Sequence, residues 1–199
     1  TGNSNNAFGY EALSDNTTGA QNCAFGHEAL EDNTTADDNT AFGFRALRLN
    51  TTGTRNTAVG SLTLSNCTTA DSNTAVGHDA LLQTTTGGVN TAFGVWALEN
   101  NTTGHSNTAI GAAALAAATT AIDNVAVGRD SLYSTTTGQY NTAVGTDSLL
   151  ANTTGASNVA VGSQAMDSCT TGQKNVAMGT DAAGQLTTGE RNTAIGNYC

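Results

Sequence analysis

Asn141-Thr142-Ala143-Val144-Gly145 is one copy of a short phrase that the chain contains twelve times. Its glycine recurs every 17 residues, from Gly9 to Gly196, without insertion or deletion. The alanine two places before the glycine and the asparagine four places before it are the same in all twelve copies. A fixed period of this length is typical of a solenoid, in which each repeat forms one coil and neighbouring coils stack.

Each position in the repeat is numbered by how many residues it lies after the glycine, and the glycine itself is step 0. Step 4 is leucine in nine coils, from Leu13 to Leu149, and then Met166 and Ala183. Steps 8 and 9 are Thr-Thr in all eleven complete copies, and the full unit is N-T-A-[VFI]-G-x-x-A-L-x-x-N-T-T-G-x-x. Because a 17-residue unit cannot bury a core alone, residues 1–199 are predicted to form a single repeat domain.

The composition excludes several classes of function. Only 11% of the residues are charged and the net charge is −10, which argues against nucleic-acid binding and mainly serves solubility. The chain has no run of about 18 apolar residues that would predict a transmembrane helix, and its start lacks a signal region. Both ends fall inside a repeat, so we expect the sequence to be a piece of a longer fibre.

Charged residues mark where each coil meets water. They occur only at steps 1–2, 5–6 and 11–12, and the segments between these corners are uncharged. An uncharged segment such as residues 141–145 is long enough for one short strand, whereas no apolar spacing of a helix persists. The sequence therefore predicts an all-β parallel β-solenoid of about 12 coils, roughly 50–60 Å long at about 4.8 Å per coil.

The two faces of the strand carry different side chains. Thr142 and Val144 point to one side and Ala143 to the other. We expect the large apolar residues at step 16, such as Val144, to lie inside with the step 4 leucines. The step 15 alanines would then form a flat outer row for contact with other chains, and this predicted interface comprises Ala7, Ala24, Ala41, Ala58, Ala75, Ala92, Ala109, Ala126, Ala143, Ala160, Ala177 and Ala194.

The opposite arrangement is the alternative: the alanines point into a very tight coil and the bulky row forms the contact between chains. Either arrangement predicts a lateral interface, because a long apolar stripe is rare on the surface of a monomer. The recurring glycine likewise has two explanations, a backbone conformation that other residues resist or a close approach between coils or subunits. The invariant asparagines, and the Thr-Thr rows, are predicted to hydrogen-bond along the stack.

The four cysteines are out of phase with one another. Cys67 and Cys169 share step 7 but lie six coils apart, which is roughly 29 Å and far beyond the limit of about 7 Å for a disulfide. We therefore expect free thiols and folding in a reducing cytosol. The alternative is chance substitution of cysteine in a secreted repeat.

No catalytic constellation can be assembled from the sequence. His27, His78 and His105 lie in distant coils at charged corners, so we expect no enzyme activity and no cofactor. Calcium-binding solenoids use G-G-x-G-x-D repeats, whereas acids at steps 11 and 12 occur in few coils, so no metal site is predicted.

Four aromatic residues at steps 1 and 2 are candidate binding residues, since an exposed ring could stack on a sugar. The alternative is that they are ordinary scattered surface aromatics. These residues are Tyr10, Phe44, Trp96 and Tyr198.

The phrase N-T-A-V-G-x-x-A-L, as in residues 73–81, resembles the N-S-V-A-I-G-x-x-S head repeats of trimeric autotransporter adhesins. The longer unit is similar to the N-T-A-V-G-x-x-A-L-x-x-N-T-T-G arrays of phage and algal-virus tail-fibre proteins. The resemblance covers the whole chain and implies a homotrimer of left-handed parallel β-rolls. It assigns no binding residues, because the repeats mark scaffold positions.

We therefore expect a stiff structural or adhesive fibre segment, of a phage tail fibre or a cell-surface adhesin, that projects and attaches to a host surface. It would be extracellular, and folded in a reducing cytosol if phage-encoded. Its partners would be further copies of the chain and a cell-surface glycan or protein receptor, without nucleic acid or membrane insertion.

The alternative function is an ice-binding β-solenoid, because threonines recur at steps 8, 9 and 14. Adjacent threonines point to opposite faces of a strand, so only one of each Thr-Thr pair can face outward. The step 14 row is also not threonine throughout, since this step is occupied by Asn6, Cys23, Val125, Val159 and Val176 in other coils.

Overall fold

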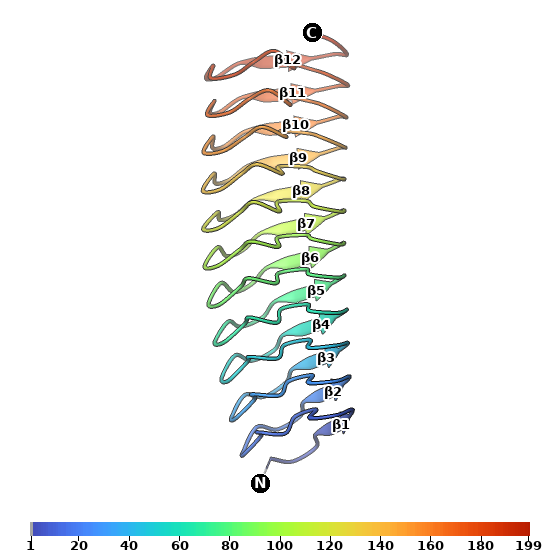
Figure 1. The fold of residues 1–199 in the computed structure, drawn as a ribbon. Helices are drawn as coiled ribbons and strands as arrows, with labels where there is room; N and C mark the ends of the chain where they lie inside the picture. The colour runs from blue at the N-terminus through green and yellow to red at the C-terminus, as the bar shows by residue number, and fades with distance from the viewer. Residues whose placement is uncertain (1) are drawn as a thin grey trace.

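A computed structural model describes residues 2–199 as a stack of coils that rises from the N-terminus to the C-terminus (Figure 1). Each coil contributes one three-residue strand to a single 12-stranded parallel sheet, whose strand order follows the chain. Residues 2–199 contain no helix, and so none that could cross a membrane. The predicted all-β parallel β-solenoid with one 17-residue coil per repeat is confirmed. The strands are β1 Asn6–Phe8, β2 Cys23–Phe25, β3 Thr40–Phe42, β4 Thr57–Val59, β5 Thr74–Val76, β6 Thr91–Phe93, β7 Thr108–Ile110, β8 Val125–Val127, β9 Thr142–Val144, β10 Val159–Val161, β11 Val176–Met178 and β12 Thr193–Ile195.

Backbone hydrogen bonds join successive coils well beyond the strands. In the sheet, each residue pairs with the residue 17 positions later, as Ala143 does with Ala160. Elsewhere in the coil, the Leu47 amide donates to the Thr63 carbonyl at 3.0 Å and the Thr51 amide to the Thr68 carbonyl at 2.9 Å. Since donors are needed around the whole circumference, the absence of proline from the chain has a direct structural reason.

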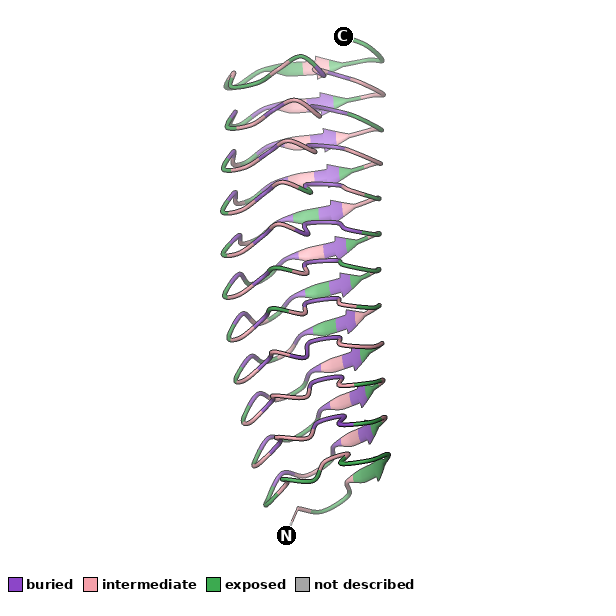
Figure 2. Ribbon diagram, in the orientation of Figure 1, coloured by how far each residue is buried: buried purple, intermediate pink, exposed green. Residues whose placement is uncertain are grey.

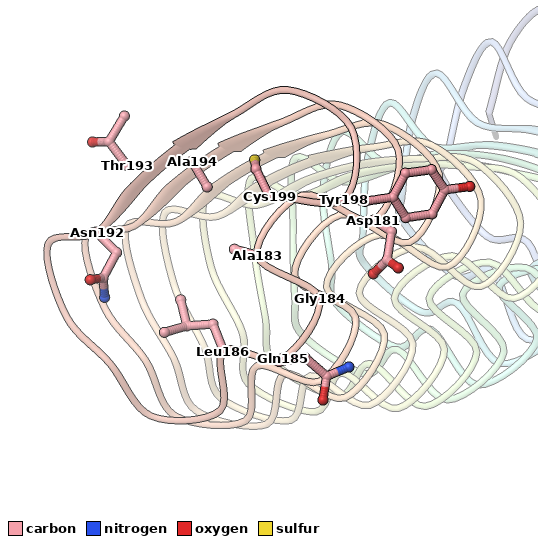
Figure 3. Close-up of a pocket in the computed structure, with 10 residues that line it drawn as sticks. All are labelled: Asp181, Ala183, Gly184, Gln185, Leu186, Asn192, Thr193, Ala194, Tyr198 and Cys199. Carbon is pink, nitrogen blue, oxygen red and sulfur yellow. The ribbon is translucent and has the colours of Figure 1, made fainter.

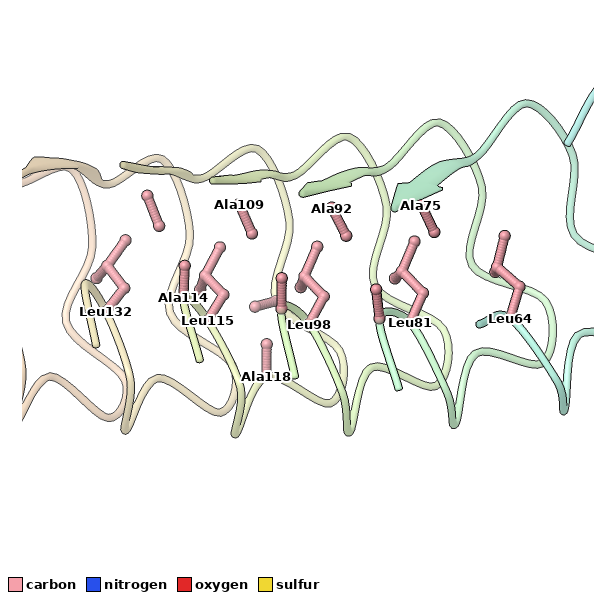
Figure 4. Close-up of a cluster of buried hydrophobic side chains, with 14 of the residues drawn as sticks. Leu64, Ala75, Leu81, Ala92, Leu98, Ala109, Ala114, Leu115, Ala118 and Leu132 are labelled. Carbon is pink, nitrogen blue, oxygen red and sulfur yellow. The ribbon is translucent and has the colours of Figure 1, made fainter. Parts of the chain in front are cut away.

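The core of each coil is narrow and contains one large side chain. Figure 3 views the last coil along its axis, and there Ala194 points into the coil while its neighbour Thr193 points away. In the middle of the stack the step 4 leucines lie in single file beneath the strand alanines, as Leu81 lies near Ala75 (Figure 4). Every step 4 leucine from Leu30 to Leu149 is fully buried.

The expectation that the large step 16 residues lie inside with the leucines is wrong. Phe42, for example, is 50% exposed. The step 15 alanines are buried instead, since all ten from Ala24 to Ala177 are no more than 1% exposed; only Ala7 and Ala194, in the end coils, are more open. Figure 2 shows this as a buried position within each of the inner strands.

The physical reason for the reversal is the small size of the coil. One leucine and the inward asparagines fill most of the interior, so a methyl group is what fits on the inner face of the strand. The predicted alanine interface is therefore corrected: the inner alanines lie within their own chain, and the bulky row lies outside, as in the alternative arrangement.

The invariant asparagines form the hydrogen-bonded ladder that the sequence predicts. The amide N and Nδ2 of Asn141 donate to Oδ1 of Asn124 at 2.9 and 3.1 Å. Its Nδ2 also donates to the Gly155 carbonyl at 2.8 Å, and its Oδ1 accepts from the amide N and Nδ2 of Asn158. Each side-chain amide is thus satisfied inside the protein, which is the condition for burying a polar group at low cost.

The two threonines of each Thr-Thr pair have different environments. The step 8 hydroxyls donate to the next coil, as Thr34 Oγ1 does to the Thr51 carbonyl at 3.1 Å. The step 9 threonines are exposed in all eleven coils that carry them. The predicted threonine ladder therefore involves the first residue of each pair.

A second asparagine ladder at step 7 is interrupted. Asn33 Nδ2 donates to Asn16 Oδ1 at 3.0 Å. The ladder fails where Ala118 follows Asn101, because alanine offers no donor, and Asn101 Oδ1 is buried without a hydrogen bond. Asn152 Oδ1, at the same step, is also buried without a hydrogen bond. The repeat thus carries local defects that its period alone does not reveal.

Candidate functional site

The outer sheet face consists of the step 14 and step 16 residues of β1–β12. It contains threonine, valine and other uncharged side chains, and no charged residue. At about 4.8 Å per strand it extends for about 50 Å, and at about 3.3 Å per residue it is about 10 Å wide. The strip covers about 500 Å², and its step 16 row is apolar in every coil from Phe8 to Ile195. Long exposed apolar rows of this kind often mark interaction sites.

Phenylalanines form a ring stack at one end of the outer sheet face. The rings of Phe8 and Phe25 are 4.7 Å apart between centroids, and those of Phe25 and Phe42 are also 4.7 Å apart and nearly parallel. The in-register pairing of β1–β3 imposes this arrangement, because it places identical positions on successive strands. The outer sheet face therefore carries its bulkiest side chains on the first three coils.

A second aromatic row lies at step 1, just beyond the glycine corner. His27 lies between Tyr10 and Phe44, with ring centroids 5.1 and 5.4 Å away, respectively. The structure thus brings together two of the four predicted aromatic residues and adds a histidine to them. The guanidinium of Arg45 lies 4.9 Å from the Phe44 ring centroid, within the range of a cation–π interaction.

An ion-pair network supports this aromatic row. Glu28 accepts from Arg45 Nε at 2.6 Å, and Arg48 Nε lies 3.1 Å from the same carboxylate. The hydrogen bond from Arg45 lowers the pKa of Glu28. Arg48 also donates to Glu31 at 2.7 Å. Because these charged groups pair with one another, the network holds the corner beside the aromatic row in one orientation.

Trp96 lies apart from this row, on a groove that the repeat pattern does not reveal. The groove has a volume of about 400 Å³ and is lined by Trp96, Ala113, Asp130, Tyr133 and Leu150. Tyr133 was not a candidate because it lies at step 5 rather than step 1 or 2. The signal that could have found it is the run of small residues at 111–118, which removes bulky side chains from one coil.

Tyr198 lies at the C-terminal end of the described stack. It borders a cavity of about 580 Å³ in which Ala183, Leu186 and Ala194 are uncovered (Figure 3). These are the same core positions that the next coil covers elsewhere, so the cavity is the open side of the last coil. Tyr198 shares no surface with the other three predicted aromatic residues.

All four cysteines are free thiols. Cys67 and Cys169 are buried, Cys23 is half-buried and Cys199 is exposed. Burial raises the pKa of the Cys67 thiol to about 12 and also raises that of Cys169. Within residues 2–199, no three His, Cys, Asp or Glu side chains are grouped so that they could hold a metal ion.

Comparison with known proteins found no match to a protein-family model, to a curated protein or to a solved structure. The class that the fold defines is a parallel β-solenoid with one exposed, uncharged sheet face. The similarity of its repeats to adhesin heads and tail fibres stays a prediction from the motif.

Proposed function

We propose that the chain is a segment of an extracellular fibre, of a phage tail fibre or a cell-surface adhesin, that projects and attaches to a host surface. Its chains associate side by side as a parallel homotrimer through the outer sheet face. The observation that carries this proposal is the exposure of the step 16 row, including Phe42, on a strip without charge.

Another copy of the chain is the partner that fits this strip best. The strip repeats at the rise of one coil along its whole length, and a parallel second copy has the same repeat and the same side chains. Uncharged surfaces of this kind can pack without leaving a buried unpaired charge, which would cost several kcal/mol. Association would also protect a thin solenoid whose coils contact only their neighbours.

The internal structure suits a shaft. Successive coils are joined by backbone hydrogen bonds around the circumference and by the asparagine ladder. A protease needs a locally unfolded segment, and such a ladder opposes local opening. A stiff, protease-resistant rod is what a projecting fibre requires.

Static light scattering on the purified chain tests the assembly. The unmodified protein should have three times the monomer mass. Joint replacement by Val127→Glu, Val144→Glu and Val161→Glu places three carboxylates on the outer sheet face, and should produce monomers that keep the β-sheet circular dichroism of the parent.

The matched control is the joint replacement Thr137→Glu, Thr154→Glu and Thr171→Glu on the exposed step 9 row of the same coils. It introduces the same charge at the same spacing away from the outer sheet face, and should leave the trimer intact. A monomeric parent protein, or equal dissociation by both sets of substitutions, would contradict the proposed assembly. Attachment is tested by adding labelled full-length fibre to host cells.

An ice-binding function is the second candidate, and one observation favours it. The step 9 threonines form an unbroken exposed row from Thr18 to Thr188. The step 8 hydroxyls are bonded to carbonyls, so the row is one residue wide on that side of the coil. Thermal hysteresis and ice-crystal shaping measure this function directly, and ice shaping by a fibre that attaches to no cell or glycan would favour it over attachment.

A further inference from the structure

One coil lacks the large side chains that its neighbours carry on the turn after the strand. Residues 111–118 are Gly-Ala-Ala-Ala-Leu-Ala-Ala-Ala. At step 2 the side chains of three successive coils are therefore Trp96, Ala113 and Asp130. Because the coils are in register, this alanine coil leaves a gap between the side chains on either side of it.

The gap is the groove of about 400 Å³ described above. Ala113 forms its floor, Trp96 stands on one side, and Tyr133 and Leu150 stand on the other. Trp96 is 48% exposed and Tyr133 is 44% exposed, so both rings have free surface. One other coil lies between the coils that carry Trp96 and Tyr133, so these two coils are roughly 10 Å apart along the stack. The volume is within the range of small-ligand pockets.

Asp130 and Tyr133 bring polar groups to this groove. Oδ2 of Asp130 is paired with Nη1 of Arg129, and Nη2 of Arg129 lies 3.6 Å from Asp147. Among residues 2–199, no hydrogen bond engages Oδ1 of Asp130, the Tyr133 hydroxyl or Nε1 of Trp96. The groove thus offers an acceptor, a hydroxyl and an indole donor beside two aromatic rings.

We propose that this groove binds a neutral hexopyranose unit of a saccharide. The C–H face of a pyranose packs on an aromatic ring, and its hydroxyls need both acceptors and donors, which Asp130 and the Tyr133 hydroxyl supply at the groove. Tyrosine and tryptophan provide rigid contact area at small entropic cost. The proposal rests on the proposed function, to which it adds a class of ligand for attachment.

The charges around the groove favour a neutral sugar over charged ligands. Asp147 and the net charge of −10 disfavour an acidic sugar or a nucleic acid. Two aromatic rings could also enclose a quaternary ammonium group. Asp130, however, is already paired with Arg129, and that exposed guanidinium repels a second cation.

Trp96 is the only tryptophan in the chain, so its fluorescence reports directly on the groove. The experiment titrates the full-length protein with cellotetraose, maltotetraose, mannotetraose and N-acetylchitotetraose, and separately with tetramethylammonium chloride and sodium glucuronate. Concentrations up to about 10 mM are sufficient, because even a Kd near 1 mM would then approach saturation. At least one neutral oligosaccharide should shift the emission with a saturating curve.

Two variants connect the signal to the groove without removing Trp96. Ala113→Gln fills the floor, and glutamine already occupies this step at Gln164 with the same left-handed backbone. Tyr133→Ser removes the opposite ring, and serine occurs at the same step at Ser65. Each should weaken binding at least about tenfold.

The matched control is Ala112→Thr, because Ala112 does not line the groove and threonine occurs at the same step at Thr146. It should bind like the parent. The proposal is overturned if no neutral saccharide changes the fluorescence, if tetramethylammonium or glucuronate alone does so, or if Ala113→Gln binds as tightly as the parent.

Light scattering on the same samples separates this proposal from the proposed assembly. No residue of the outer sheet face lines the groove. Saccharide binding by a monomeric protein would support the groove and reject the trimer. A trimer whose Trp96 responds to no neutral saccharide would support the proposed assembly and reject the groove as a saccharide site.

Discussion

Gly145 and Gly162 occupy the same corner of successive coils so closely that a Cβ atom on Gly145 would lie 2.5 Å from the carbonyl oxygen of Gly162. Gly145 also has a φ of +135°, which L side chains rarely adopt. The two explanations for the recurring glycine, a special backbone conformation and a close approach between coils, therefore hold at once. This corner ends the strand and permits the spacing on which the whole stack depends.

Gly145→Ala should destabilise the protein strongly, because it adds both backbone strain and a clash with main-chain atoms. We expect a loss of at least about 2 kcal/mol in the free energy of unfolding, measured by urea denaturation. Ser163→Ala, at an exposed step where alanine already occurs in another coil, is the control and should change stability little. Equal stability of the two variants would contradict the close packing of the corner.

Ala143→Glu and Val144→Glu should have opposite consequences although the residues are adjacent. Ala143 is 0% exposed, so a carboxylate there is buried without a partner and should cost about 3–5 kcal/mol. Val144 is 37% exposed on the outer sheet face, so its replacement should leave each chain folded. Thermal denaturation followed by circular dichroism distinguishes them, and the orientation of the strand is wrong if Val144→Glu unfolds the chain and Ala143→Glu does not.

Ala118→Asn should stabilise the protein, because it restores the interrupted step 7 ladder. The new side-chain amide can donate to Oδ1 of Asn101, which is buried without a hydrogen bond. A gain of about 0.5–1.5 kcal/mol is expected from one satisfied hydrogen bond. Ala118→Val adds bulk without a donor and should not stabilise; a gain from valine equal to that from asparagine would show that filling space is the cause.

The thiols should react in order of exposure. Iodoacetamide should modify Cys199 rapidly in the native protein, whereas Cys67 should react only after denaturation, because it is buried and its thiol has a pKa of about 12. Mass spectrometry of peptides measures the extent at each site. Rapid native modification of Cys67 would contradict the closed core.

The same burial makes stability depend on pH in the alkaline range. The pKa of Cys67 is raised from its usual 9.0 to about 12, so the unfolded chain loses this proton first. The stabilising contribution is complete below about pH 9 and is lost as pH rises toward 12. Cys67→Ala should therefore show a smaller loss of unfolding free energy between these pH values than the parent, and an unchanged slope would contradict this assignment.

The sequence by itself determined the architecture, because its period, its asparagines and its uncharged segments all repeat in one register. The strand position, the parallel pairing and the hydrogen bonds of Asn141 to the asparagines of the neighbouring coils follow from that register alone. Alternation along the strand also correctly separated Ala143 from Val144.

Only the tertiary structure decided which of these two residues is buried. Hydrophobicity favours valine inside, but the interior beside Leu149 and the asparagine ladder has room for a methyl group, and the size of the coil overrides the preference. The placement of Trp96 and Tyr133 on one groove likewise does not follow from comparing the repeats step by step. It arises because one coil of alanines lets side chains from two other coils face the same groove, and that is a property of stacking rather than of any single repeat.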